Sequence, residues 1–146
     1  MSAVLTLYRV EADAAQPNPA AAAVGDPLDL GQSWDLLQTL LAGDRNGWSG
    51  HGDAELAIVG GLTSQTTAGG MLISIDAARV CRVAAYLARV SFADLVSSHY
   101  RAVESACGGD PARILDEDLR PRLNELRDFY RVAAGARNAV VKRISG

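Results

Sequence analysis

The sequence has few of the residues that commonly bind metals or carry out nucleophilic catalysis. It contains two cysteines and two histidines in 146 residues, and aromatic residues make up 5%. The cysteines, Cys81 and Cys107, form no C-x-x-C pair, and neither has a cysteine or histidine at metal-ligand spacing. We therefore expect no metal, no cofactor and no disulfide, with Cys81 near the buried face of a helix.

Long apolar runs are also missing. No run approaches the roughly 18 residues that a membrane-spanning helix requires. The N-terminal stretch MSAVLTLYRV has neither the basic start nor the long apolar core of a signal peptide. We therefore expect a cytoplasmic protein with no membrane partner, organised as one domain over residues 1–146.

Basic residues are sparse and almost all of one kind. Lys142 is the only lysine among the 14 basic residues, which we interpret as codon bias in a GC-rich genome. The net charge of −3 and pI near 5.3 do not favour nucleic-acid binding. The charge is uneven, because residues 1–75 sum to −6 and residues 76–146 to +3.

What is present indicates an α/β domain. In the first half, the patterns predict a strand over 4–10, a connector with at most a short helix over 11–27, and a helix at WDLLQTLLA that ends at Gly43. Ser33 or Asp29 is the predicted cap of that helix. The stretch ELAIVGG (55–61) predicts a strand, LTSQTTAGG (62–70) a polar loop and MLISI (71–75) a strand.

In the second half, apolar residues at three- and four-residue spacing predict three helices. The first follows a cap at Asp76, the second runs from Ser91 to about Ala106, and the third covers about 116–134. A last strand is predicted over 139–145. This order predicts helices packed on a small sheet.

Candidate catalytic groups are weak. His51 and Asp53 in GHGD could orient an imidazole as a general base, and Asp53 with Glu55 could form a carboxylate pair. The loop around Gly60-Gly61 lacks the Gly-Lys-Ser/Thr ending of a phosphate-binding loop. We interpret it as an ordinary connection.

The order of several motifs resembles the YfbM-like family of small uncharacterised bacterial proteins. The matching residues are Tyr8-Arg9-Val10, Trp34-Asp35, Leu37, Leu40-Leu41, Gly43, Gly60-Gly61, Val80, Leu126-Arg127 and Phe129-Tyr130. The sequence departs from the family at 76–79, where Asp-Ala-Ala-Arg replaces Thr-Pro-Glu-Glu, and in the loop from Gly61 to Asp76. The resemblance implies a three-layer α-β-α fold with a mixed sheet, and it implies no reaction.

Two functions fit these observations. The first is a non-catalytic module that binds another macromolecule, with a protein as the expected partner and an immunity- or antitoxin-like role as one example. It would be a monomer or weak homodimer, and its uneven charge would supply complementarity to the partner. The second is a small-molecule-binding protein or enzyme with a cleft between the helix that begins at Trp34 and the Gly60-Gly61 loop. For that site the candidate ligand-binding residues are Arg9, Trp34, Asp35, Arg127 and Tyr130.

Each candidate also has a structural interpretation. Trp34 falls on the same helix face as Leu37, which favours core packing, whereas Asp35 points about 100° away from it. Arg9 and Arg127 could form internal ion pairs. The indole and the neighbouring carboxylate are therefore not expected to act as one site.

Overall fold

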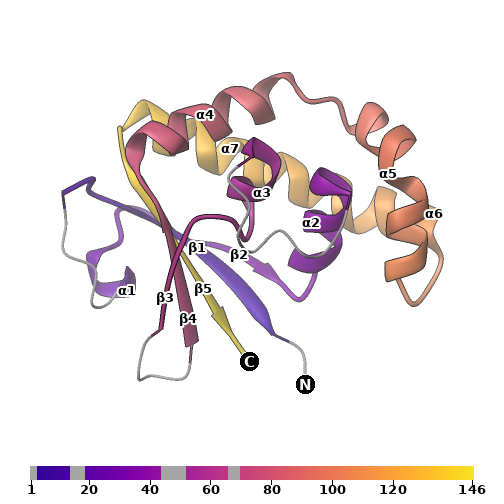
Figure 1. Ribbon diagram of the computed structural model, residues 1–146, viewed down its shortest axis with the longest axis horizontal. Coiled ribbons are helices and arrows are strands. Elements are labelled where there is room, and N and C mark those ends of the chain that lie inside the picture. The colour runs from indigo at the N-terminus through magenta and orange to yellow at the C-terminus, as the bar shows by residue number, and fades with distance from the viewer. Residues whose placement is uncertain (1–2, 14–18, 44–51, 66–69) are drawn as a thin grey trace.

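The computed structural model describes residues 3–13, 19–43, 52–65 and 70–146. Within these residues, five strands form one sheet in the order β2-β1-β5-β4-β3, and every neighbouring pair is antiparallel (Figure 1). The strands are β1 (Val4–Val10), β2 (Leu28–Gly31), β3 (Leu62–Gln65), β4 (Gly70–Ile75) and β5 (Ala139–Ser145). The predicted α/β class is confirmed, but the sheet is antiparallel throughout rather than mixed.

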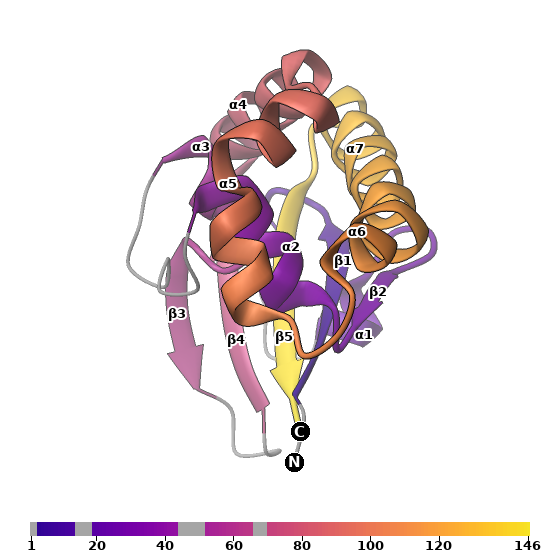
Figure 2. The ribbon, with the colours of Figure 1, turned by 90° about the vertical axis from the view of Figure 1, so that its right-hand side faces the viewer.

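Every described helix except α1 lies on one face of this sheet (Figure 2). They are α2 (Trp34–Ala42), α3 (Asp53–Ala57), α4 (Ala77–Arg89), α5 (Phe92–Ala106), α6 (Pro111–Ile114) and α7 (Arg120–Gly135), with a π-helical turn over Leu115–Leu119 before α7. Against the other face lies the short α1 (Pro19–Ala22). The three layers that the resemblance implied are thus very unequal in thickness.

Successive side chains along each strand point to opposite faces of the sheet, so the apolar core has two parts. On the face covered by α2–α7, side chains such as Leu5, Leu7 and Val140 join the large apolar core with the buried leucines of the helices. On the opposite face, Tyr8 and Val141 form a small second cluster beneath α1. The covered face therefore carries most of the apolar burial.

Most predicted elements are confirmed, because their signals are local. The strand at 4–10 and the strand at 139–145 have the predicted bounds. Asp76 caps α4 by accepting a hydrogen bond from the Arg79 amide, and Ser91 caps α5. Helix α2 ends at Gly43, whose φ of 87° is left-handed.

Two local predictions are wrong, and both lie between Asp53 and Gln65. Residues 53–57 form helix α3 rather than a strand, because a short apolar run does not distinguish a buried helical turn from a strand. Residues 62–65 form strand β3 rather than a loop. As an edge strand with one neighbour among the described residues, β3 shows no apolar alternation that the sequence could reveal.

Two predictions about side chains, the cap of α2 and the burial of Cys81, are also wrong. Ser33 precedes α2 but makes no capping hydrogen bond with its side chain. The Asp29 carboxylate instead accepts a hydrogen bond from the Gly31 amide within β2. Cys81 is exposed on α4, because it is one residue, or about 100°, away from the buried position Val80.

Gly61, between α3 and β3, is required by its backbone. Its φ is 134°, and a Cβ there would lie 2.7 Å from the Ser74 carbonyl oxygen. We expect Gly61→Ala to lower the free energy of unfolding by about 2 kcal/mol or more, since strain and a backbone clash combine. Gly108→Ala is the control, because a Cβ there meets no atom within 4 Å. Urea denaturation measures both; equal stability of the two variants would contradict the prediction.

Candidate functional site

The C-terminal end of α3 is held by a buried lysine. Lys142 lies on β5, the central strand, and its register partners are Leu7 on β1 and Ile73 on β4. Its side chain is fully buried on the helix-covered face of the sheet. The Nζ atom donates hydrogen bonds to the Leu56 carbonyl oxygen and, at 2.8 Å, to that of Gly60.

A buried tyrosine binds the same end of the helix. Tyr130 on α7 is fully buried, and its hydroxyl donates to the carbonyl oxygen of Ala57 at 2.8 Å. A five-residue helix cannot satisfy its last carbonyls with its own amides. Lys142 and Tyr130, which we call the α3 clasp, supply the missing donors from the sheet and from α7.

Burial changes the acid–base behaviour of both groups in the α3 clasp. Desolvation lowers the pKa of the Lys142 amine well below its usual value and raises the pKa of the Tyr130 hydroxyl. An amine with a lowered pKa is the kind that forms Schiff bases. Here, however, it is inaccessible to solvent and donates to two backbone carbonyls, so its geometry is that of an anchor.

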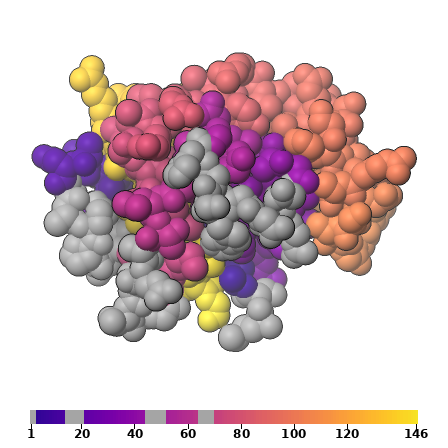
Figure 3. Space-filling model, viewed as in Figure 1, coloured from indigo at the N-terminus to yellow at the C-terminus, as the bar shows by residue number. Residues whose placement is uncertain are grey.

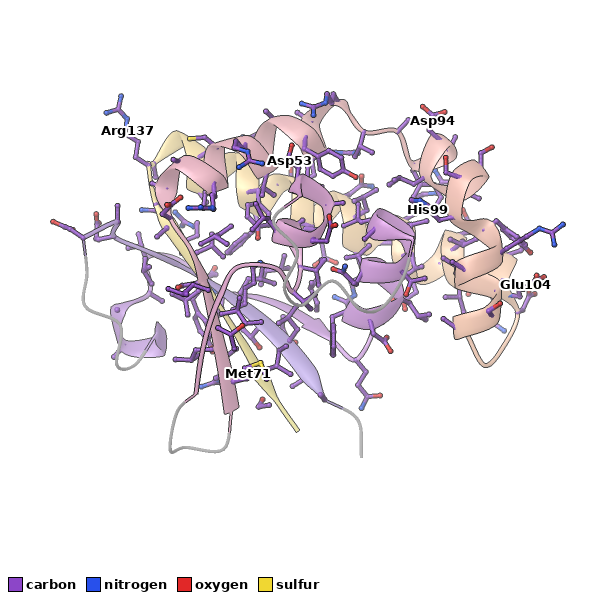
Figure 4. The ribbon with its side chains drawn as sticks, viewed as in Figure 1. Asp53, Met71, Asp94, His99, Glu104 and Arg137 are labelled. Atoms are coloured by element: carbon purple, nitrogen blue, oxygen red, sulfur yellow. The ribbon has the colours of Figure 1, made fainter. Side chains whose placement is uncertain are left out.

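The N-terminal end of α3 is held by ion pairs with arginines of α4. The Asp53 carboxylate lies 3.0 Å from Arg82 Nη2 and 3.9 Å from Arg89 Nη2, so it is clamped against α4 (Figure 4). Between these arginines along α4 is Tyr86, whose pKa is raised by partial burial and by the carboxylates of Asp53 and Glu55. The predicted carboxylate pair is thus found on a helix, with Asp53 engaged by arginines.

The segment from α3 to β3 leads to one edge of the sheet, and the two edges differ. The β2 edge carries a charge at Asp29 and has a register irregularity opposite Leu5 and Thr6. The Asp29 carbonyl oxygen accepts a hydrogen bond from Arg122 of α7. Strand β3 (LTSQ) contains no charged residue and no proline. Leu62 at its start is 75% exposed, and Figure 3 shows atoms of this segment at the surface below α4.

The predicted ligand-binding arginines lie apart and bind neutral oxygens. Arg9 on β1 donates to the Asn138 side-chain carbonyl at 2.9 Å. Arg127 on α7 donates to the carbonyl oxygens of Leu87 and Val90 at 2.7 and 2.9 Å, and so caps the end of α4. These contacts replace the internal ion pairs that we considered from the sequence.

The other predicted residues are distributed over the core. Trp34 is half-buried against the large apolar core and donates from Nε1 to the Ala3 carbonyl oxygen at 3.0 Å. Asp35 lies in the first turn of α2, where a carboxylate is favoured by the helix dipole. Tyr130 belongs to the α3 clasp. That these residues bind a ligand together stays a prediction.

The sequence contained a signal for the α3 clasp that we interpreted differently. Lys142 is the single lysine of an arginine-rich chain, and it interrupts the apolar strand at 139–145. Codon bias explains the arginines but not this exception. A compact amine fits a desolvated position where the bulkier, always charged guanidinium would not.

Other candidates contribute little to the site. His51 lies outside the described residues, whereas His99 on α5 bonds the Leu40 carbonyl oxygen at 2.7 Å and so links α5 to α2 (Figure 4). The described ranges contain no group of three or more residues arranged to hold a metal ion. Nor is any described helix long and apolar enough to cross a membrane.

Replacing Lys142 changes how stability depends on pH. The unfolded chain binds this proton up to a pKa of about 10.5, and the folded protein releases it at lower pH. Stability therefore rises with pH between these two values, by up to about 1.4 kcal/mol per pH unit. We expect the free energy of unfolding of Lys142→Met not to show this increase with pH. Urea unfolding of both proteins between about pH 7 and 10 tests it, and parallel curves would show that the buried amine stays protonated.

Removing the Tyr130 hydroxyl leaves the Ala57 carbonyl oxygen without its donor. We expect Tyr130→Phe to lower the free energy of unfolding by about 1–2 kcal/mol. We also expect it to speed amide hydrogen exchange at 58–60 more than elsewhere. Tyr100→Phe, at a half-buried position on α5, is the control. Uniformly faster exchange throughout the protein would argue against a local role.

Comparison with known proteins agrees with this architecture. The crystal structure of YfbM from Escherichia coli, a protein of unknown function, superposes with a TM-score of 0.72, at 12% identity, over 97% of this chain and 99% of that chain. No curated protein matches the sequence. The model of the domain of unknown function DUF1877 matches residues 2–142. Since that match covers nearly the whole chain, the protein belongs to the DUF1877 family.

Proposed function

We propose that this protein is a non-catalytic module that binds another protein, and that it accepts an extended segment of its partner at the β3 edge. The observation that carries the proposal is the difference between the two sheet edges. At β2 a charge, a register irregularity and an arginine from α7 oppose further pairing. Strand β3 contains no charged residue and no proline. Within the described residues only β4 pairs with it.

Strand addition requires both backbone groups and a specific side-chain contact. The outer edge of β3 offers the backbone groups, and Leu62 offers an apolar side chain. Leu62 is one of two large hydrophobic residues that are exposed in the described part of the chain, the other being Val132 at 42%. Leu62 therefore combines apolar exposure with an open strand edge, whereas Val132 lies on helix α7.

The β3 edge is also preorganised. The α3 clasp fixes the carbonyls of Leu56 and Gly60 just before the strand, and Arg82 fixes the start of α3 through Asp53. A binding edge held in place loses little conformational freedom when a partner segment pairs with it. The acidic N-terminal half and basic C-terminal half would orient the approaching partner.

We further propose that the partner is encountered in the cytoplasm. Cys81 and Cys107 are both free, with Cys81 exposed. Exposed free thiols are compatible with a reducing compartment and unfavourable in an oxidising one.

A pair of matched substitutions tests the proposal. A photo-crosslinking benzoylphenylalanine at position 62 is expected to capture one protein from the native cell at a single peptide, whereas the same residue at position 132 captures none. A synthetic copy of that peptide should then slow amide exchange across 62–65. Leu62→Lys should weaken its binding at least tenfold, equivalent to about 1.4 kcal/mol, and Val132→Lys should leave it unchanged.

Three results would contradict the proposal. The first is equal crosslinking at both positions, and the second is a bound peptide that protects amides elsewhere. The third is a crosslink of position 62 to a second copy of this chain, with a dimer in analytical ultracentrifugation, which would mean that β3 pairs with itself.

A further inference from the structure

Among the described residues, one fully buried polar side chain has no hydrogen-bond partner. Four polar or charged residues are fully buried in the described part of the chain: Gln38, Thr39, Asn138 and Lys142. Three of them are satisfied, since Thr39 donates to the Asp35 carbonyl oxygen, Asn138 accepts from an arginine and Lys142 donates to α3. Gln38 is the exception.

Both amide atoms of Gln38 are unsatisfied. The residue is 0% exposed, and neither Nε2 nor Oε1 has a partner among the described residues. Folded proteins rarely bury such a group, because it gives up its bonds to water and gains nothing in return. A methionine or leucine would fill the same space without this penalty. A buried polar group with no partner is therefore a local violation of the type that is found at functional sites.

Gln38 lies one helical turn after the first residues of α2. It follows Trp34 by four residues and Asp35 by three, so it is a neighbour of each of them on the helix surface. Helical side chains lean toward the N-terminus of their helix, so the Gln38 side chain leaves α2 in the direction of its first turn. At that turn the Ser33 hydroxyl makes no capping bond and donates instead to Asp118, at 2.7 Å.

We propose that Gln38 is the recognition group of a small-molecule site at the first turn of α2, and that its ligand is a neutral molecule with a donor beside an acceptor. A cyclic amide, such as a lactam or the edge of a pyrimidine, matches the two atoms of the glutamine amide. The Trp34 ring supplies an apolar aromatic surface for the ligand to pack against. Its Nε1 donates to the Ala3 carbonyl oxygen, and this hydrogen bond holds the ring in place.

The charge at the site argues for a neutral ligand. Asp35 lies in the same turn, so an anion would meet a carboxylate there. A cation would leave the Nε2 donor of Gln38 without an acceptor. Burial adds to the penalty for either charge. The site is separate from the β3 edge, so this inference does not depend on the proposed protein partner.

The test uses a matched pair of probes on the intact protein. 2-Pyrrolidinone has an N–H beside its carbonyl, and γ-butyrolactone has the same ring without that donor. In nuclear magnetic resonance spectra of ¹⁵N-labelled protein, we expect millimolar 2-pyrrolidinone to shift the side-chain amide signals of Gln38, and γ-butyrolactone to leave them in place.

Gln38→Met supplies the second measurement. It should unfold at a higher temperature than the native protein, because it removes two unsatisfied polar atoms, and the lactam should no longer shift the backbone amides of the first turn of α2. Gln32→Met, at an exposed position before that helix, should leave both results unchanged. A lower unfolding temperature or failure of Gln38→Met to fold, no lactam-induced shift in the native protein, or equal shifts with the lactone would each overturn the proposal.

Discussion

The burial of one amine beneath α3 is the constraint on which the arrangement of this protein depends. Lys142 occupies the centre of the sheet's covered face, where an apolar side chain would be expected, and it reaches the carbonyls of Leu56 and Gly60. Helix α3 is too short to satisfy its last carbonyls, such as that of Leu56, with its own amides. The sheet, α7 and the segment that leads into β3 are therefore joined through polar contacts in the core, and the position of the open sheet edge follows from them.

Much of the fold can be predicted from the sequence where the physical signals are local. Periodic apolar residues and caps such as Asp76 and Ser91 define α4 and α5, and β-branched residues define the strand at 139–145. The segment from Asp53 to Gln65 cannot be predicted in this way. Its helix is stabilised by donors more than 70 residues away in the chain, and its strand, LTSQ, has a single apolar residue, so no alternation marks it in the sequence.

The candidate site was harder to predict than the fold. Arg9, Trp34 and Arg127 were predicted as candidate ligand-binding residues, but sequence spacing could not show that each donates to a backbone or amide oxygen of the folded protein. Lys142 was visible as an exception in composition, yet only its position on the central strand shows what it does. Gln38 gave no signal at all, because an isolated glutamine in a helix is ordinary until its surroundings are known.

The order of the strands also has a consequence for how the chain reaches its folded state. Strands β1 and β2 form one antiparallel pair and β3 and β4 another, and only β5 lies between them. Each pair can form early from nearby residues, but the two halves cannot become one sheet before residues 139–145 have left the ribosome. The lysine that secures α3 arrives with that strand, so closure of the sheet and anchorage of α3 are one late step in folding.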